Sequence, residues 1–419
     1  MSVIRKGLGL VLSGVAVLAC SEQTPLESPG VDLAPQFHHS NAPPAPPAAL
    51  GWQALARSLV GTNNIGPVPA ARVYALVSVA QYGAINDQND DDDGNRSDHG
   101  DGRDGRDGRR RVAFERGAVA GASWVVLAFL FPNSAAALEQ RVHDEEAAAG
   151  TPHFSRGIED GKEMGNRLVE WAKADRSTVP FTGTIPVGPG LWTRNPAPSG
   201  GVLPPLVAPT FGGVAPYFLR LGSQFRPLPP PAFNSPAFVA ALAEISALSA
   251  NRTPEQLAIA RFWNFAAGTP STPGYWNQVA SDFIEQYGLN EREATHVFGL
   301  MHAAMVDAAI GCWDAKFFYW YIRPSQVDPA ITLPIGLPNH PSYPSGHSCQ
   351  SSAATTVLTH FFPQQAENLK GQLELAGLSR MYAGIHYRFD IDAGQELGTS
   401  VGKYAIRFDN RRGLLFRIP

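Results

Sequence analysis

The sequence predicts an all-α protein, built from helical bundles with long irregular connections. Apolar residues recur with the spacing of one helix face through most of the chain. Capping residues, or prolines typical of a first helical turn, precede several of these stretches. No stretch of any length alternates apolar and polar residues as a half-buried strand does. With 419 residues the chain can bury a large core, and its net charge of -4 argues against a nucleic-acid binder.

The first residues have the pattern of an export signal. Arg5 and Lys6 precede an apolar run, Leu8–Ala19, so we expect a signal peptide over residues 1–19. Cys20 follows directly and resembles a bacterial lipobox, which implies a lipid on the mature N-terminus. An ordinary signal peptide is the alternative. We therefore expect an exported bacterial protein that is anchored by lipid to the outer membrane or cell surface, or else is periplasmic or secreted.

Composition divides the rest of the chain. Residues 20–50 are rich in Pro, Ala and Ser and are expected to be a tether, followed by a helical domain over residues 51–419. Residues 86–111 have almost no apolar side chains, which predicts a disordered insertion. Residues 181–236 are crowded with Pro and Gly, which predicts an irregular wrap over the surface.

The expected helices follow in chain order. One begins near Trp52, and Pro69 opens the next. Residues 112–174 are helical in pattern, and residues 290–322 form the strongest helical block, with a capping arrangement at its start. The others are expected at residues 235–250, 253–267, 275–287 and 348–361.

Three short segments concentrate reactive side chains within residues 312–392. In the first, Lys316 and Arg323 are seven residues apart, so we expect them on one helix face, two turns apart. Two cations there, without acidic partners, indicate an anion between them. Solvated surface charges are the alternative.

The second segment is Pro344-Ser345-Gly346-His347, before an expected helix. Backbone N–H groups at a helix N-terminus form an oxyanion cradle, and the Ser345 hydroxyl adds a donor. His347 is placed to exchange a proton with a bound group. A capped turn with a packed histidine is the alternative.

In the third segment His386 and Asp390 are four residues apart, one helical turn. The carboxylate would hold one imidazole N–H and leave the other nitrogen as a nucleophile or ligand. Arg380 would supply a bidentate donor pair. Together the three segments predict a site for a multiply charged oxyanion such as phosphate or vanadate.

The spacing of these motifs resembles that of the type 2 phosphatidic acid phosphatase and vanadium-dependent haloperoxidase superfamily. The resemblance implies a helical-bundle fold of the haloperoxidase type. It implies that His386 bonds to the vanadium of vanadate or to phosphorus, and that His347 is the acid–base residue. The residues implied to bind the oxygens of the anion are Lys316, Arg323, Ser345, Gly346 and Arg380.

Two branches of the superfamily compete. In the haloperoxidase branch, vanadate stays on His386 as the cofactor, Lys316 polarises bound hydrogen peroxide, and a halide is oxidised to a hypohalous acid equivalent. In the phosphatase branch, His386 attacks a phosphomonoester and becomes a phosphohistidine, while Asp390 orients it. An anion-binding lipoprotein without turnover is a third hypothesis.

Features outside the cradle favour the haloperoxidase branch by resemblance. These are Trp313, the segment Phe262–Gln278, and His340, which implies bromide or iodide rather than chloride. A loop histidine near the mouth of the site, without a role, is the alternative for His340. A small organic acceptor is a further candidate partner. One departure is the missing acid after Trp263, so Arg380 would need another partner.

Two further expectations concern single residues. Asp307 is a candidate for the acid that Arg380 lacks. Cys312 and Cys349 are the cysteines that follow Cys20. They fit either a disulfide or two buried free thiols.

Overall fold

The computed structural model describes residues 46–86, 104–197, 199, 201–266 and 268–412, and these residues contain helices and no strand. The predicted all-α fold is confirmed. The signal peptide and the lipid attachment at Cys20 lie outside the described residues and stay predictions. The α-helices are α1 (Ala48–Thr62), α2 (Pro67–Asn86), α4 (Asp104–Leu130), α5 (Ala135–Ala149), α6 (Pro152–Ala174), α7 (Pro236–Ala250), α8 (Pro254–Phe262), α9 (Ser271–Gln286), α10 (Glu291–Tyr319), α11 (Pro324–Val327), α12 (Gly346–Phe361), α13 (Ala366–Tyr382) and α14 (Arg388–Arg412).

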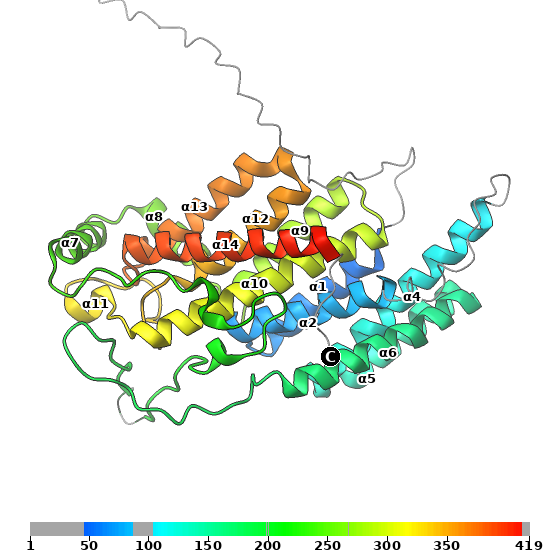
Figure 1. Ribbon diagram of the computed structural model, residues 1–419, viewed down its shortest axis with the longest axis horizontal. Helices are drawn as coiled ribbons and strands as arrows, with labels where there is room; N and C mark the ends of the chain where they lie inside the picture. Colours follow the sequence, from blue (N-terminus) through cyan, green and yellow to red (C-terminus); the bar gives the residue numbers. More distant parts are fainter. Residues whose placement is uncertain (1–45, 87–103, 198, 200, 267, 413–419) are drawn as a thin grey trace, which may run out of the picture. The chain divides into compact units, whose positions relative to one another are not determined.

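The central element is α10, which packs against α2, α12 and α14 (Figure 1). Its first turn has a capping box, because Asn290 accepts from the backbone N–H of Glu293 and Glu293 accepts from that of Asn290. Small buried residues such as Ala303 and Ala304 let neighbouring helices approach closely. This buried helix carries Lys316 in its last turn.

Two helices, α4 and α10, are long and apolar enough to cross a bilayer by length and composition. In α10, 94% of the apolar window is buried by the rest of the fold, which marks a core helix. In α4 the buried share is 56%. Glycines bring α4 close to α6: a Cβ at Gly117 would lie 2.1 Å from the carbonyl oxygen of Phe154.

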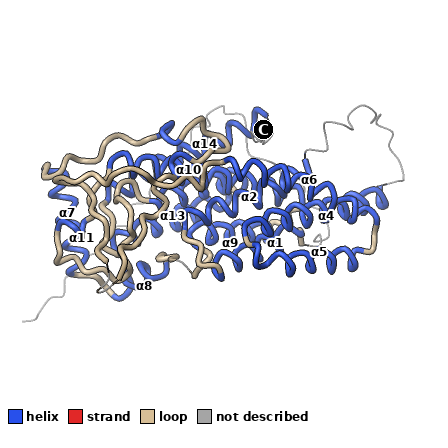
Figure 2. Tube along the Cα trace, turned by 90° about the horizontal axis from the view of Figure 1, so that it is seen from below, coloured by secondary structure: helices blue, strands red, loops and turns tan. Residues whose placement is uncertain are grey.

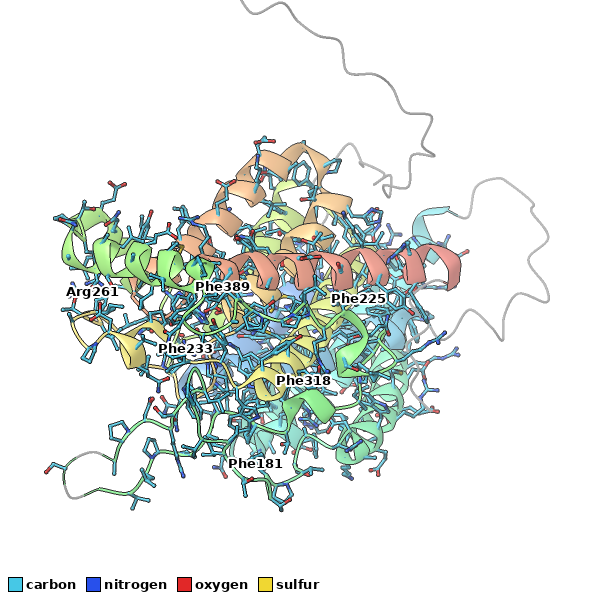
Figure 3. The ribbon with its side chains drawn as sticks, turned by 60° about the vertical axis from the view of Figure 1, so that its left-hand side comes forward. Phe181, Phe225, Phe233, Arg261, Phe318 and Phe389 are labelled. Carbon is cyan, nitrogen blue, oxygen red and sulfur yellow. The ribbon has the colours of Figure 1, made fainter. Side chains whose placement is uncertain are left out.

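Loops gather at the end of the bundle that holds α7, α8 and α11 (Figure 2). Aromatic rings hold this end together. The ring of Tyr387 stacks on that of Phe389, with ring centroids 4.8 Å apart. The centroid of Phe238 lies 5.6 Å from that of Tyr387 and 4.9 Å from that of Phe233. Phe389 and Phe233 are labelled in Figure 3. The C-terminal end of α10 and the N-terminal ends of α12 and α14 meet here, and they position the candidate site.

Among the boundaries that differ from the predicted ones, three concern α4, α1 and α8. Helix α4 begins at Asp104, so residues 104–111 of the insertion predicted to be disordered are helical. Extending a packed helix costs less than starting one, and the Arg111–Glu115 ion pair at 3.7 Å supports this turn. Helix α1 begins at Ala48, inside the predicted tether. The Glu291 carboxylate accepts the N–H groups of Ala48 and Ala49 at 2.7 and 2.8 Å, a tertiary cap that local patterns do not contain.

The third difference is α8, which ends at Phe262 although the sequence predicts helix to residue 267. Phe265 has a φ of +38°, a left-handed conformation that interrupts the helix. The described residues after this break form an irregular segment before α9, and this segment reaches the candidate site.

Candidate functional site

Lys316 and Arg323 do not share a helix face. Helix α10 ends at Tyr319, Trp320 is left-handed with a φ of +50°, and Arg323 is the extended residue before α11. The expectation of one continuous helix is therefore wrong. The chain turns so that both cations are fully buried and point into the same region.

Backbone carbonyls hold both cations. Lys316 Nζ donates to the oxygens of Pro341 and Ser342 at 2.9 and 2.7 Å, and Arg323 Nη1 donates to the oxygen of Ile385 at 2.7 Å. Burial lowers the pKa of Lys316 to about 8 and that of Arg323 to about 10. The neutral carbonyls fix the positions of these charges without cancelling them.

Arg380, in the last turn of α13, is 2% exposed. Its Nε donates to Ser379 Oγ at 3.0 Å and its Nη2 to the oxygen of Ala260 at 3.1 Å, and the described residues give it no carboxylate partner. Asp307 does not fill this role, because it accepts backbone N–H groups from the connection before α7. Neutral oxygens thus take the place of the missing acid, and Arg380 keeps its charge for a ligand.

His386 and Asp390 are in contact, but not on one helix face. His386 precedes α14, and Asp390 reaches back from its first turn to accept from His386 Nδ1 at 2.8 Å and from the Tyr387 N–H at 3.1 Å. Ser342 Oγ donates to the same carboxylate oxygen. With the proton on Nδ1, Nε2 carries the lone pair; its contact is a long one, 3.5 Å to Arg323 Nη1, which a ligand could replace. Burial, then Arg323 and Lys316, hold the pKa of His386 well below its usual value.

The N-terminus of α12 forms the next wall. Ser345 is the N-cap, and its Oγ accepts from the Ser348 N–H at 3.4 Å. A Cβ at Gly346 would lie 3.0 Å from the Trp313 ring, so a larger residue would push against that ring. The glycine therefore lets the peptide N–H groups of the first turn approach a bound anion.

His347 is fixed from outside the predicted motifs. Its Nε2 lies 2.8 Å from the oxygen of Trp263 and 3.1 Å from Thr272 Oγ1. A carbonyl can only accept, so Nε2 carries the proton and Nδ1 is left as the proton acceptor. Burial, then Arg380, lowers the pKa of His347 well below its usual value. The motifs gave no signal for Thr272 as a partner, although it lies within the segment Phe262–Gln278.

His340 and Trp313 lie together beside the cradle, with ring centroids 5.1 Å apart. Arg323 Nη2 is 3.2 Å from His340 Nδ1, and Trp313 Nε1 donates to the oxygen of Val207 at 3.0 Å. A cavity of about 290 Å³ opens above the cradle and is lined by both residues together with His347, Arg380 and His386, among others.

The two cysteines are free and buried. Cys312 lies one turn before Lys316 on α10, and Cys349 lies in the first turns of α12. Of the two readings that the sequence leaves open, the structure has the free thiols.

Charge decides what the site can hold. Three buried cations, Lys316, Arg323 and Arg380, converge on a region where Asp390 is the nearby buried carboxylate. Such an excess of buried positive charge is costly without an anion. The described residues contain no group of three or more His, Cys, Asp or Glu side chains that could hold a bare metal ion. The donor set therefore fits a metal only as an oxyanion, such as vanadate, with His386 Nε2 as the protein ligand.

Comparisons with known sequences agree with this chemistry. A profile of the PAP2 superfamily matches residues 295–414. A non-specific acid phosphatase of Providencia stuartii is 32% identical over 125 residues, which cover 28% of this chain and 50% of that protein. One from Salmonella typhi is 39% identical over 57 residues, or 14% of this chain and 23% of that protein. The chain thus spans at most half the length of these relatives.

Comparisons with solved structures cover most of the chain. The first bacterial vanadium-dependent iodoperoxidase superimposes with a TM-score of 0.70 at 23% identity, over 88% of this chain and 98% of that one. A holo-type bacterial vanadium-dependent chloroperoxidase gives a TM-score of 0.66 at 17% identity, over 85% of this chain and 96% of that one. Residues 295–414 therefore match the PAP2 superfamily profile, and the chain shares the all-helical fold of these two vanadium-dependent haloperoxidases.

Proposed function

We propose that this protein is a vanadate-dependent haloperoxidase that oxidises bromide or iodide with hydrogen peroxide to a hypohalous acid equivalent. The observation that carries the proposal is the cradle itself: three buried cations without carboxylate partners lie around His386, whose Nε2 has one long contact, 3.5 Å to Arg323 Nη1. The likeness of fold to two vanadium haloperoxidases over most of the chain supports this branch.

Vanadate bound in this cradle would activate hydrogen peroxide for attack by a halide. The protein residues prepare the site for it. His386 presents Nε2 because Asp390 holds its other nitrogen. Arg380 offers the guanidinium N–H groups that Ser379 and Ala260 do not use. The remaining N–H groups of Arg323 lie 3.5 Å from His386 Nε2 and 3.2 Å from His340 Nδ1, so a bound anion would replace these contacts. Lys316 keeps its third ammonium N–H for the oxygen that is activated. His347 takes up or returns a proton at Nδ1.

A second candidate function is hydrolysis of phosphomonoesters. The sequence relatives at 32 and 39% identity support it, because both are non-specific acid phosphatases. In this reaction His386 Nε2 attacks phosphorus and forms a phosphohistidine, while His347 protonates the leaving oxygen. Water then attacks the phosphohistidine and releases phosphate.

One paired assay separates the two functions. Residues 21–419 are purified, freed of bound anions, and tested with and without orthovanadate for peroxide-dependent bromination of a phenolic dye and for hydrolysis of an aryl phosphate. We expect vanadate to switch bromination on and to suppress any hydrolysis, because both anions compete for one cradle. Hydrolysis with no vanadate-dependent bromination would overturn the haloperoxidase proposal and establish the phosphatase.

Thr272 is predicted to position the acid–base residue. Thr272→Val removes one acceptor of the His347 Nε2 proton, which is worth about 1 kcal/mol, so kcat should fall about fivefold. An imidazolium donates more strongly than a neutral imidazole, so losing the acceptor lowers the pKa of His347. The acidic limb of the pH–rate profile should then move to lower pH. Thr272→Ser keeps the oxygen and should behave as wild type. If valine leaves both kcat and the profile unchanged, Thr272 only fills space.

His340 is predicted to influence halide preference. His340→Phe replaces a polar wall of the cavity by an apolar one. Because the family resemblance associates a histidine here with bromide or iodide, losing it should shift the preference toward chloride. We expect the ratio of kcat/KM for bromide to that for chloride to fall about tenfold, or ~1.4 kcal/mol. Vanadate affinity is measured in parallel, because Arg323 loses a neighbour. An unchanged ratio with intact vanadate binding removes the role of His340.

A further inference from the structure

The cavity above the cradle is larger than peroxide and a halide require. Its volume is about 290 Å³, whereas one water occupies about 30 Å³ of liquid. Gly346, His347, Arg380 and His386 of the cradle form its floor, and its walls are mainly apolar. They come from α2, the connection before α7, the segment after α8, α10 and the loop before α12: Val68, Val207, Phe265, Trp313, Ile335 and Leu337. An apolar cavity of this size suits a small organic molecule.

One polar side chain on these walls lacks a partner. Gln350 lies on α12, one turn after His347, and lines the cavity on the same side. It is 1% exposed, and its Oε1 has no hydrogen-bond partner among the described residues. Leaving a buried amide oxygen unpaired costs about 1–3 kcal/mol. The χ3 torsion of glutamine is broad, so the amide can turn Oε1 toward a donor in the cavity.

Aromatic neighbours narrow the choice of ligand. Phe265 holds a left-handed conformation with a φ of +38°, which is uncommon for a bulky residue, and it packs against Trp263 with centroids 5.5 Å apart. Trp313, fixed by its bond to the Val207 oxygen, forms another wall. Two aromatic walls and one unpaired acceptor match a flat ring that carries an O–H or N–H group.

We propose that this cavity binds a neutral single-ring aromatic compound of the phenol type, whose O–H donates to Gln350 Oε1. This inference rests on the proposed haloperoxidase function. The hypohalous acid equivalent formed at the floor then meets a bound acceptor. The halogen forms a bond to a ring carbon, that carbon loses its proton, and the proton joins the departing hydroxide as water. Gln350 selects the acceptor and takes no part in peroxide activation.

Equilibrium binding tests the cavity without turnover. Titration calorimetry compares p-cresol with its methyl ether, which cannot donate, on the wild-type protein and on Gln350→Met, a variant of similar length and volume. We expect the wild type to bind p-cresol at least tenfold more tightly than the ether, and the variant to lose this preference. Equal affinities in the wild type, or a preference that survives in Gln350→Met, would overturn the proposal, leaving water as the occupant.

Turnover provides a second readout. In Gln350→Met the KM for p-cresol should rise about tenfold while the KM for bromide and the vanadate affinity stay unchanged. Bromination whose rate does not saturate with p-cresol, with no binding by calorimetry, would refute the cavity and leave the haloperoxidase proposal standing. Selective binding of p-cresol without any bromination would refute the haloperoxidase proposal and keep Gln350 as the selective group.

Discussion

Replacing His386 by alanine is expected to abolish turnover, by about 10³-fold or more, in whichever of the two reactions the protein catalyses. Both reactions use the Nε2 lone pair, either to hold vanadium or to attack phosphorus. The variant should also bind orthovanadate more weakly, because Lys316, Arg323 and Arg380 can still attract the anion but nothing anchors it. Steady-state kinetics and a vanadate titration measure the two effects.

An effect of His386→Ala on folding must be distinguished from its effect on catalysis. His386 is 3% exposed, and Asp390 keeps two other donors, Ser342 Oγ and the Tyr387 N–H, after its removal. The thermal midpoint should therefore fall only slightly. His143→Ala, at an exposed position on α5, is the matched control and should match wild type in every assay. A His386→Ala protein that keeps a tenth of the activity would mean that another residue holds the anion.

Much of the fold was predictable because local signals agree with the tertiary structure. The Asn290–Glu293 capping box and the apolar periodicity of α10 both appear in the sequence. The start of α1 was not predictable, because Glu291, more than two hundred residues away, caps it. The end of α8 was missed for a related reason. Phe265 adopts a left-handed conformation that its own preferences disfavour, so tertiary contacts must impose it.

For the candidate site, too, one part could be predicted from the sequence and another could not. Residue identities were predictable, because the cations, the N-terminus of α12 and the His386–Asp390 pair fall in short motifs. Geometry was not. Helical spacing placed Lys316 and Arg323 on one face, whereas the left-handed Trp320 ends the helix between them. Backbone oxygens of Ala260 and Trp263 help to hold Arg380 and His347, and a backbone oxygen leaves no trace in residue type.

Asp307 is the other residue whose loss should have a large effect, on stability rather than on chemistry. It is fully buried on α10, and its carboxylate accepts the N–H groups of Tyr217, Phe218 and Leu219 at 2.8, 2.7 and 2.9 Å. Burial raises its pKa to about 6, so it is ionised at pH 7.5. Asp307→Ala removes the carboxylate that accepts from three buried N–H groups and should cost about 3–5 kcal/mol of unfolding free energy.

Urea unfolding at pH 7.5 measures this cost, with Asp282→Ala on the exposed face of α9 as a control expected to stay within about 0.5 kcal/mol. The Asp307→Ala substitution should also affect the candidate site. The connection that Asp307 holds includes Val207, whose oxygen fixes Trp313 at the cavity wall. Asp307→Ala should therefore weaken p-cresol binding even under conditions where the protein remains folded. A variant as stable as wild type would mean that the three N–H groups find other acceptors, and that the connection does not depend on α10.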